Sequence, residues 1–209
     1  MAFFRRAALE KDGFYDAAAD GERQHSIWQR MVRSHVRERV KGLAGGLASA
    51  LDVGCGNGDF TAKLARLHPS VAFRGHDASP EMTELARGRY GGAPNLSYAA
   101  HDLLTPREPG EEFDLVLCIN MFHHVHPDDQ ERGLDILAAL TGGHLLLEIK
   151  NGDNLYNRTF RSSTSFPVAL ISPRRVRRHM ASRGLRCQDH WNIFGLGLLS
   201  PIVILEFSR

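Results

Sequence analysis

A glycine-rich stretch between an apolar run and a helical run is the part of this chain best suited to hold a ligand. Residues 51–60 read Leu-Asp-Val-Gly-Cys-Gly-Asn-Gly-Asp-Phe, so Asp52 is followed by glycines at 54, 56 and 58. Glycine lets a backbone turn sharply out of a strand and touch a ligand, because no Cβ blocks positive φ or close approach. The stretch therefore predicts a nucleotide-type pocket at the end of a strand.

The spacing of these glycines argues against a dinucleotide. The dinucleotide fingerprint G-x-G-x-x-G, started at Gly54, requires a third glycine at position 59, where this chain has Asp59. An acid at the mouth of the loop would also oppose a pyrophosphate. Both features count against NAD.

Two further acids follow strand-like runs. Asp77 comes after residues 71–76, and a carboxylate there can accept hydrogen bonds from both hydroxyls of a ribose. Asp102 follows residues 96–100 and is suited to accept from the exocyclic amine of adenine. The ends of three strands therefore point at one crevice.

A histidine-rich segment, residues 121–129, suggests a metal site because three histidines and two acids lie within it. The spacing argues against that interpretation, since adjacent histidines point in different directions and His126 with Asp128 fits the start of a surface helix. We expect no metal. His124 is the general-base candidate, because a neutral imidazole can remove a proton from a hydroxyl; packing beside a ligand is the alternative.

Strand-like and helix-like runs alternate from residue 48 onward, which predicts an α/β fold with a doubly wound sheet and helices on both faces. The last two strands have no helix between them, so they can only form an antiparallel pair. The predicted strands are residues 48–53, 71–76, 96–100, 113–119, 144–149, 185–190 and 202–207, and the predicted helices are residues 21–40, 59–67, 79–89, 127–140 and 173–183.

Four motifs in order along the chain resemble those of the class I S-adenosylmethionine-dependent methyltransferases, in particular the small type 11/12 enzymes similar to ubiquinone-biosynthesis methyltransferases. They are Leu51–Gly58, His76–Ser79, His101–Leu103 and Phe113–Cys118. The resemblance covers residues 45–150 motif by motif and the terminal strand pair in topology. It implies a Rossmann-like, seven-stranded mixed sheet whose last strand is antiparallel and lies beside the fifth, with S-adenosyl-L-methionine as cofactor.

The resemblance also implies which residues bind that cofactor. The glycine stretch would shape its methionine end, Asp77 would hold the ribose, and Asp102 with Leu103 would receive adenine. Asn120 would approach the methionine amino or carboxylate group, and His124 aligns with a histidine frequent in related enzymes. Plain core packing is the alternative for Met82. The full implied set is Asp52, Gly54, Cys55, Gly56, Asp77, Ala78, Met82, Asp102, Leu103 and Asn120.

Methyl transfer from a sulfonium depends mainly on in-line positioning, so a missing catalytic signature is expected. Acceptor choice should then depend on the N-terminal helices and on residues 151–171, a long stretch between predicted elements that we interpret as a substrate lid. The expected acceptor is a small molecule such as a hydroxylated aromatic, a polyketide or an isoprenoid-like metabolite, methylated on oxygen, nitrogen or carbon. Candidate acceptor contacts are Tyr15, His123, Asn151, Tyr156 and Arg158.

Two other functions stay open. An RNA- or protein-directed methyltransferase is disfavoured by the net charge of +2, and because residues 118–122 read Cys-Ile-Asn-Met-Phe where amino-methylating members have Asn/Asp-Pro-Pro-Tyr. A catalytically silent cofactor-binding module is the other possibility, because an intact pocket does not prove turnover. Neither the oligomeric state nor the identity of the acceptor follows from the sequence.

Composition and length predict one methyltransferase domain. The chain has 209 residues, of which 43% are hydrophobic and 24% charged. We divide it into an N-terminal helical cap (1–45), a cofactor-binding core (46–150), the lid (151–171), and a C-terminal helix with the strand pair (172–209).

The remaining sequence features concern location and surface. Three dispersed cysteines without CxxC spacing, no signal peptide and no integral membrane segment favour a cytoplasmic protein. The basic run at residues 174–179 could serve a phosphate, acyl-carrier or membrane partner, but we expect most of it to be a solvated helix face.

Overall fold

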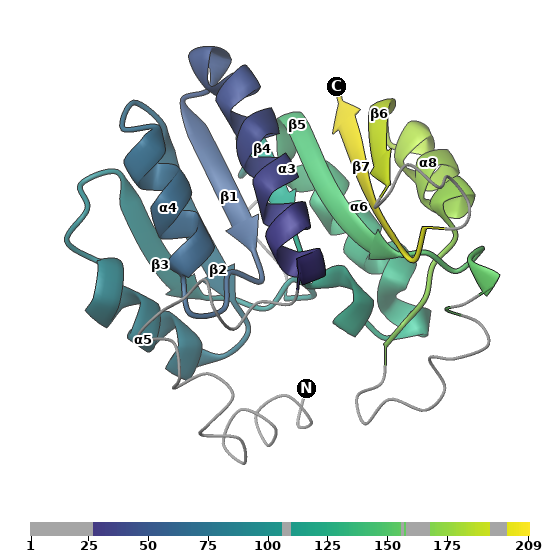
Figure 1. Cartoon of the computed structure of the whole chain (residues 1–209), viewed down its shortest axis with the longest axis horizontal. Coiled ribbons are helices and arrows are strands. Elements are labelled where there is room, and N and C mark those ends of the chain that lie inside the picture. Colours follow the sequence, from purple (N-terminus) through teal and green to yellow (C-terminus); the bar gives the residue numbers. More distant parts are fainter. Residues whose placement is uncertain (1–26, 106–109, 156, 158–167, 193–199) are drawn as a thin grey trace.

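The computed structural model describes residues 27–105, 110–155, 157, 168–192 and 200–209. Within them the strands are β1 (Ser49–Val53), β2 (Ala72–Asp77), β3 (Leu96–Ala100), β4 (Phe113–Cys118), β5 (Thr141–Lys150), β6 (Arg186–Asn192) and β7 (Ile202–Ser208). They form one seven-stranded sheet in the order β3-β2-β1-β4-β5-β7-β6 (Figure 1). The pairs from β3 through β5 are parallel, whereas β7 runs antiparallel to both β5 and β6. The predicted mixed sheet and its terminal antiparallel pair are confirmed.

Helices cover both faces of this sheet, as the alternating pattern predicted (Figure 1). One apolar core lies under α3 (Ile27–Leu43), α4 (Asp59–Leu67) and α5 (Pro80–Tyr90), and a second lies under α6 (Gln130–Leu140) and α8 (Pro173–Ser182). The first six residues of the predicted helix at 21–40 lie outside the described ranges. No helix within those ranges is long and apolar enough to cross a membrane.

Local capping fixes where two of these helices begin. Ser79 Oγ accepts a hydrogen bond of 3.2 Å from the Met82 N–H, and Pro80 occupies the first position of α5, as its missing N–H favours. The predicted helix at 127–140 instead opens with a 3-10 turn, η4 (Pro127–Asp129), before α6. Its cap is the His126 ring, whose Nδ1 accepts from the Asp128 N–H at 3.3 Å.

Strand β5 begins at Thr141, three residues before the expected start. Its extra residues include Gly142 and Gly143, and they run close beside β4. A Cβ on Gly143 would lie 2.5 Å from the Asp114 carbonyl oxygen, so only glycine fits there. Glycine in a run disfavours a strand by propensity, but close backbone approach explains it here.

The amphipathic helix α3 is fastened to the sheet at β7 and β6. Arg39 makes a two-pronged ion pair with Glu206, at 2.8 and 2.6 Å, and the His35 ring stacks on Trp191 with centroids 4.7 Å apart. Bidentate guanidinium–carboxylate contacts fix orientation as well as distance. They hold the N-terminal half of α3 over the carboxyl ends of β4 and β5.

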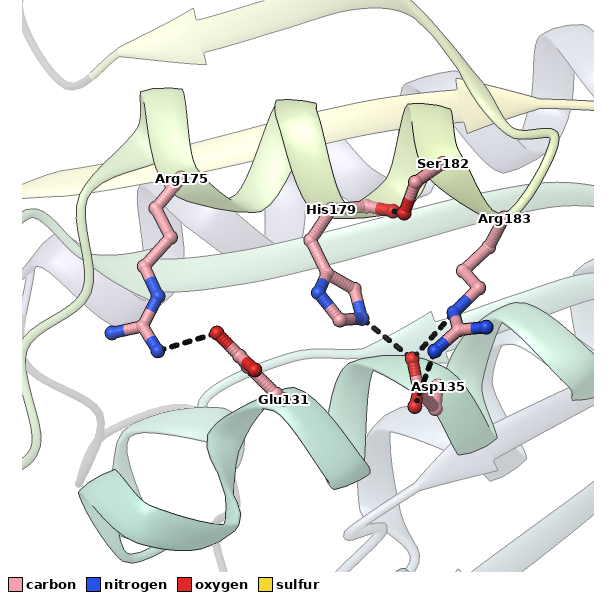
Figure 2. A network of polar contacts seen from close by, with 6 residues as sticks. All are labelled: Glu131, Asp135, Arg175, His179, Ser182 and Arg183. Carbon is pink, nitrogen blue, oxygen red and sulfur yellow. Dashed lines mark hydrogen bonds and ion pairs between the residues drawn. The ribbon is translucent and has the colours of Figure 1, made fainter.

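The basic run at 174–179 is more than a solvated face, because part of it binds α8 to α6 (Figure 2). Arg175 pairs with Glu131 at 2.7 Å, and His179 Nε2 lies 2.5 Å from Asp135 Oδ1. Arg183, just after the helix, adds two contacts to the same aspartate, at 2.8 and 2.9 Å. Sequence periodicity could not show this, because the acids lie more than 40 residues away.

Candidate active site

The turn from β1 into α4 has the conformation that its glycines predict. Gly54, Gly56 and Gly58 all have positive φ, of 78°, 55° and 77°. The N–H groups of Gly54 and Cys55 both donate to the His76 carbonyl, at 2.7 and 3.0 Å, and so attach the turn to the end of β2. A Cβ added at Gly56 would meet no atom within 4 Å. The turn is therefore open on the side where a ligand could approach its backbone.

Asp77 is the last residue of β2, and its carboxylate joins the glycine turn to the start of α5. Its Oδ2 accepts from the Gly56 N–H at 2.8 Å and its Oδ1 accepts from the Ser79 N–H at 2.9 Å. Burial raises the pKa of Asp77, while these two hydrogen bonds work in the opposite direction. The acid thus lies at the strand end where the sequence predicts a ribose contact.

Asp102 follows β3 and has one unused oxygen. Its Oδ1 accepts from the Leu104 N–H at 2.9 Å. Its Oδ2 is buried, and no donor in the described part of the chain lies within hydrogen-bonding distance. Neighbouring Leu103 is 5% exposed, with its side chain packed in the core near Phe122. The carboxylate thus keeps one oxygen without a partner in the described chain, whereas most of the Leu103 side chain is committed to the core.

The two residues expected to line the ribose or adenine face lie at the start of α5. Ala78 is exposed, and Met82 is half-buried with its N–H bonded to Ser79. Met82 is not enclosed by the core, so its side chain keeps a surface that a ligand could contact.

Asp52 is a buried acid near the end of β1. Its Oδ2 accepts from Thr61 Oγ1 at 2.5 Å, a contact between β1 and α4. Burial raises the pKa of Asp52 to about 6; the Thr61 hydrogen bond and the Arg33 charge oppose this, and Asp77 adds to it. The neighbouring thiol of Cys55 is partly buried, and burial raises its pKa as well. Neither group has the surroundings of an activated nucleophile.

Asp59, the acid that replaces the third glycine of a dinucleotide loop, has two cationic partners. Its Oδ2 lies 3.3 Å from Arg33 and 3.2 Å from Lys63. The Arg33 guanidinium also lies 5.2 Å from the centre of the Phe60 ring. Sequence analysis missed Arg33, because it comes from α3 and only tertiary packing brings it to the start of α4.

Arg33 also lines a recess at the carboxyl ends of β4 and β5. The recess has an empty volume of about 270 Å³, part of it open to solvent. Asn120 lies on its wall with a left-handed backbone (φ 55°), a conformation that asparagine tolerates better than most residues. The position agrees with a site for the polar end of a ligand. The lining residues are Gln29, Val32, Arg33, Ile119, Asn120, Glu148, Lys150 and Ile202.

A buried ion pair forms one wall of this recess. Glu148 Oε1 lies 2.5 Å from Lys150 Nζ, and Glu148 Oε2 accepts from the Asn120 N–H at 2.9 Å. Both side chains point to the α3 face of β5, since alternate residues of a strand share a face and Leu146 packs in the core under α3. Sequence analysis did not find this pair. Its only signal was two charges at alternate positions in an otherwise apolar strand.

The adjacent histidines lie in η3 (Phe122–His124), with ring centroids 3.9 Å apart. His123 is buried, whereas His124 keeps part of its surface exposed while its ring is partly desolvated. Burial of the imidazole and, second, the charge of Lys150 lower the pKa of His124 to about 4. Its ring is therefore neutral near pH 7, and the lowered pKa makes it a weaker base than an ordinary imidazole. No three histidine, cysteine or acidic side chains in the described ranges are placed to hold a metal ion.

The expected acceptor contacts are less well supported. The Asn151 amide is buried; it donates to the Ser200 carbonyl at 3.0 Å and accepts from the Asp153 N–H at 2.9 Å. The structure thus gives Asn151 a role in joining β5 to β7, and its side chain is not available to an acceptor. Tyr15, Tyr156 and Arg158 lie outside the described residues.

The described end of the predicted lid runs past the histidines and the end of β5. The Ala169 N–H donates to the His123 carbonyl at 2.8 Å, and the Ile171 N–H donates to the Lys150 carbonyl at 3.1 Å. These contacts place residues 168–171 beside the recess. His123 thus contributes its backbone to the anchoring of this segment.

Known proteins match the part of the chain that carries the glycine turn and the three acids. A family model described as a methyltransferase domain matches residues 50–142. The malonyl-[acyl-carrier protein] O-methyltransferase 1 of Ilyobacter polytropus is 28% identical over 66% of this chain and 48% of its own. The ubiquinone biosynthesis O-methyltransferase of Cupriavidus pinatubonensis is 35% identical over 54% of this chain and 44% of its own. The chain thus spans less than half the length of both curated relatives.

A solved structure shares the fold over almost the whole chain. Magnesium protoporphyrin IX methyltransferase from Synechocystis PCC 6803, crystallised with bound SAH, superimposes with a TM-score of 0.69 at 18% identity. The match covers 97% of this chain and 99% of that one. At this identity the similarity establishes the architecture, including the terminal antiparallel strand.

Proposed function

Because the chain belongs to the class I S-adenosylmethionine-dependent methyltransferases, we propose that it transfers the methyl group of S-adenosylmethionine to an oxygen atom of a small molecule. One feature supports the choice of oxygen: both curated relatives described above are named O-methyltransferases. The net charge of +2 disfavours an RNA-directed enzyme.

The observation that carries the proposal is the buried Asp102 Oδ2, which lacks a donor from the described chain. An unsatisfied buried carboxylate oxygen is costly, and the exocyclic amine of adenine supplies the missing donor. The open backbone of Gly56 and the carboxylate of Asp77 lie at the neighbouring strand ends, in the order expected for a ribose between adenine and a methionine chain. The residues present therefore fit an adenosyl ligand.

We assign the methionine end to the recess beneath α3. Arg33 brings a guanidinium to its wall for the carboxylate, and Asn120 brings an amide. Ala78 and Met82 would border the ribose and adenine. The Gly54 turn, held closed by the His76 carbonyl, sets the distance between these groups. In this assignment Asp52 and Cys55 do not contact the ligand; their side chains pack against the glycine turn.

When bound, the sulfonium supplies an electrophilic methyl group with a good leaving group, so the protein contributes mainly position. An acceptor oxygen would approach on the side of Lys150, whose charge also acts on His124. His124 is neutral near pH 7 and a weak base, so its role there is to border the acceptor. Residues 169 and 171 are held next to this side by hydrogen bonds to the His123 and Lys150 carbonyls.

The division of the chain remains part of this proposal. Residues 46–150 bind most of the cofactor, and the helix within residues 1–45 adds Arg33 at its methionine end. That helix and the segment 151–171 also choose the acceptor. Residues 172–209 complete the sheet and brace α6. The continuous sheet and the two cores that share it favour one folding unit.

Thermal unfolding with S-adenosylmethionine, S-adenosylhomocysteine or NAD tests the cofactor. The first two should raise the melting temperature, since a ligand at about 100 times its Kd stabilises by about 2.7 kcal/mol. Asp77→Ala should remove the shift, while the exposed Glu84→Gln should keep it. A shift with NAD alone would refute the proposal. Cofactor binding without formation of S-adenosylhomocysteine across an acceptor panel would instead indicate a silent binding module.

A further inference from the structure

Lys150 is a buried lysine with more donors than the described protein uses. Its side chain is 7% exposed and lines the recess at the end of β5. An ammonium carries three N–H donors, and the hydrogen bond that the structure gives it goes to Glu148 Oε1. Burying a lysine is unfavourable unless its charge and donors are matched.

Glu148 supplies the charge but cannot supply more acceptors. Its side chain is 2% exposed, with Oε1 on Lys150 and Oε2 on the Asn120 N–H. The carboxylate thus fixes the ammonium from one side and the loop after β4 from the other. The further N–H donors of Lys150, which the described contacts do not use, are what the recess offers to one more acceptor oxygen.

We propose that Lys150, held in place by Glu148, recognises an ionised oxygen of the methyl acceptor, either a carboxylate or a phenolate. The inference rests on the proposed function and names the acceptor class for that same site. An uncharged amide or an amine lacks the negative oxygen that this ammonium matches.

This contact would also suit the transfer step. The bound oxygen forms a bond to the methyl carbon while the bond between that carbon and sulfur breaks. The electron pair of the broken bond stays on sulfur, which leaves a neutral thioether. A carboxylate has no proton to lose, and a phenol enters as its phenolate, having already given its proton to solvent. Because the product ester or ether carries no charge, its bond to Lys150 is weaker, which favours release.

Binding to the protein saturated with S-adenosylhomocysteine tests the inference, with benzoate, 4-nitrophenolate and the uncharged benzamide as probes. We expect benzoate or 4-nitrophenolate to bind about tenfold or more tightly than benzamide, the usual difference for a hydrogen bond to a charged group. The anion that binds more tightly identifies carboxylate or phenolate as the acceptor group. Calorimetry or chemical-shift titration measures all three.

The variant pair is designed to keep the fold. Glu148→Gln combined with Lys150→Met removes both charges together, leaves no unpaired buried ion, and keeps an oxygen for the Asn120 N–H. The double variant should bind the anions no better than benzamide. The single variant Lys150→Arg keeps the positive charge and should still bind the anions more tightly than benzamide. Lys41→Met, at the exposed end of α3, is the charge-matched control and should behave as wild type.

Two results would overturn the inference. One is equal or absent binding of both anions and benzamide by the wild-type protein. The other is an anion preference that survives in the double variant. Failure of the proposed function is a separate result. It would be seen before any probe is added, because the protein would not bind S-adenosylhomocysteine.

Discussion

The Asp77 carboxylate accepts a 2.8 Å hydrogen bond from the backbone N–H of Gly56, so the proposed ribose acid also holds the glycine turn. The other oxygen of Asp77 caps the start of α5 through Ser79. Turn, strand end and helix start are therefore joined through one carboxylate. Pre-organisation of this kind reduces the entropy lost on binding.

The glycine turn gives a first prediction, because two of its glycines are required for different reasons. A Cβ at Gly54 would lie 2.2 Å from Met121 Cγ, so Gly54→Ala should destabilise the fold by about 2 kcal/mol or more, from left-handed strain plus the clash. Gly56→Ala meets no atom within 4 Å and should cost about 1 kcal/mol while weakening S-adenosylhomocysteine binding far more. Urea unfolding and calorimetry separate the two effects. Unimpaired binding by a folded Gly56→Ala protein would contradict it.

Asp102 gives a second prediction, on base recognition. The wild-type protein should bind S-adenosylhomocysteine about tenfold or more tightly than S-inosylhomocysteine, whose 6-oxo group faces the carboxylate with an acceptor instead of a donor. Asp102→Asn should lose or reverse this preference, because an amide can turn its NH₂ toward the oxo group. Competition binding measures the ratio directly. An unchanged ratio in the variant would show that Asp102 does not contact the base.

Asp52 predicts a pH dependence of stability. Its folded pKa of about 6 lies above the ordinary 3.8, because burial disfavours the ionised form. The folded state thus binds the proton more tightly, and the associated stability is fully present below about pH 4 and lost as pH rises through 6. Asp52→Asn keeps an oxygen for the Thr61 hydroxyl and does not titrate. As pH rises, the variant should therefore avoid the loss of unfolding free energy, on the order of 2–3 kcal/mol, that we expect for wild type.

Urea unfolding of wild type and Asp52→Asn across this pH range isolates the effect, since the other titrating groups are common to both proteins. The variant should gain on wild type as pH rises. A constant difference, or one that changes in the opposite direction, would show that Asp52 is ionised at ordinary pH in the folded protein.

The brace between α6 and α8 gives a fourth prediction. Asp135→Asn weakens contacts to both His179 and Arg183 and should destabilise the protein by about 1 kcal/mol, less at high salt, because these groups are partly exposed. Glu131→Gln is the matched control on the same helix, since its pair with Arg175 is more exposed and should have no measurable effect. An equal loss of unfolding free energy in both variants would show that Asp135 contributes no more to stability than Glu131.

Much of the proposed cofactor site follows from local sequence. Asp52, Asp77 and Asp102 each lie at or beside the end of a short strand-like run, and in a parallel sheet such ends share one edge. Positive φ at Gly54 and Gly56 follows from the same reasoning, because a turn out of a strand needs it. The antiparallel last strand was predictable too, since no crossover helix precedes it.

Lys150 and Arg33 show what only the folded chain decides. They lie 117 residues apart in the sequence, and each reads locally as an ordinary charge, in a strand and on a helix. They line one recess because the Arg39–Glu206 and His35–Trp191 contacts fasten α3 to β7 and β6, which buries the Glu148–Lys150 pair beneath it. Strand and helix patterns, and the glycines and acids at the strand ends, depend on neighbours along the chain. They can therefore be read from the sequence, and they identify the methyl donor. Which groups meet the acceptor depends on long-range packing, which no local pattern records.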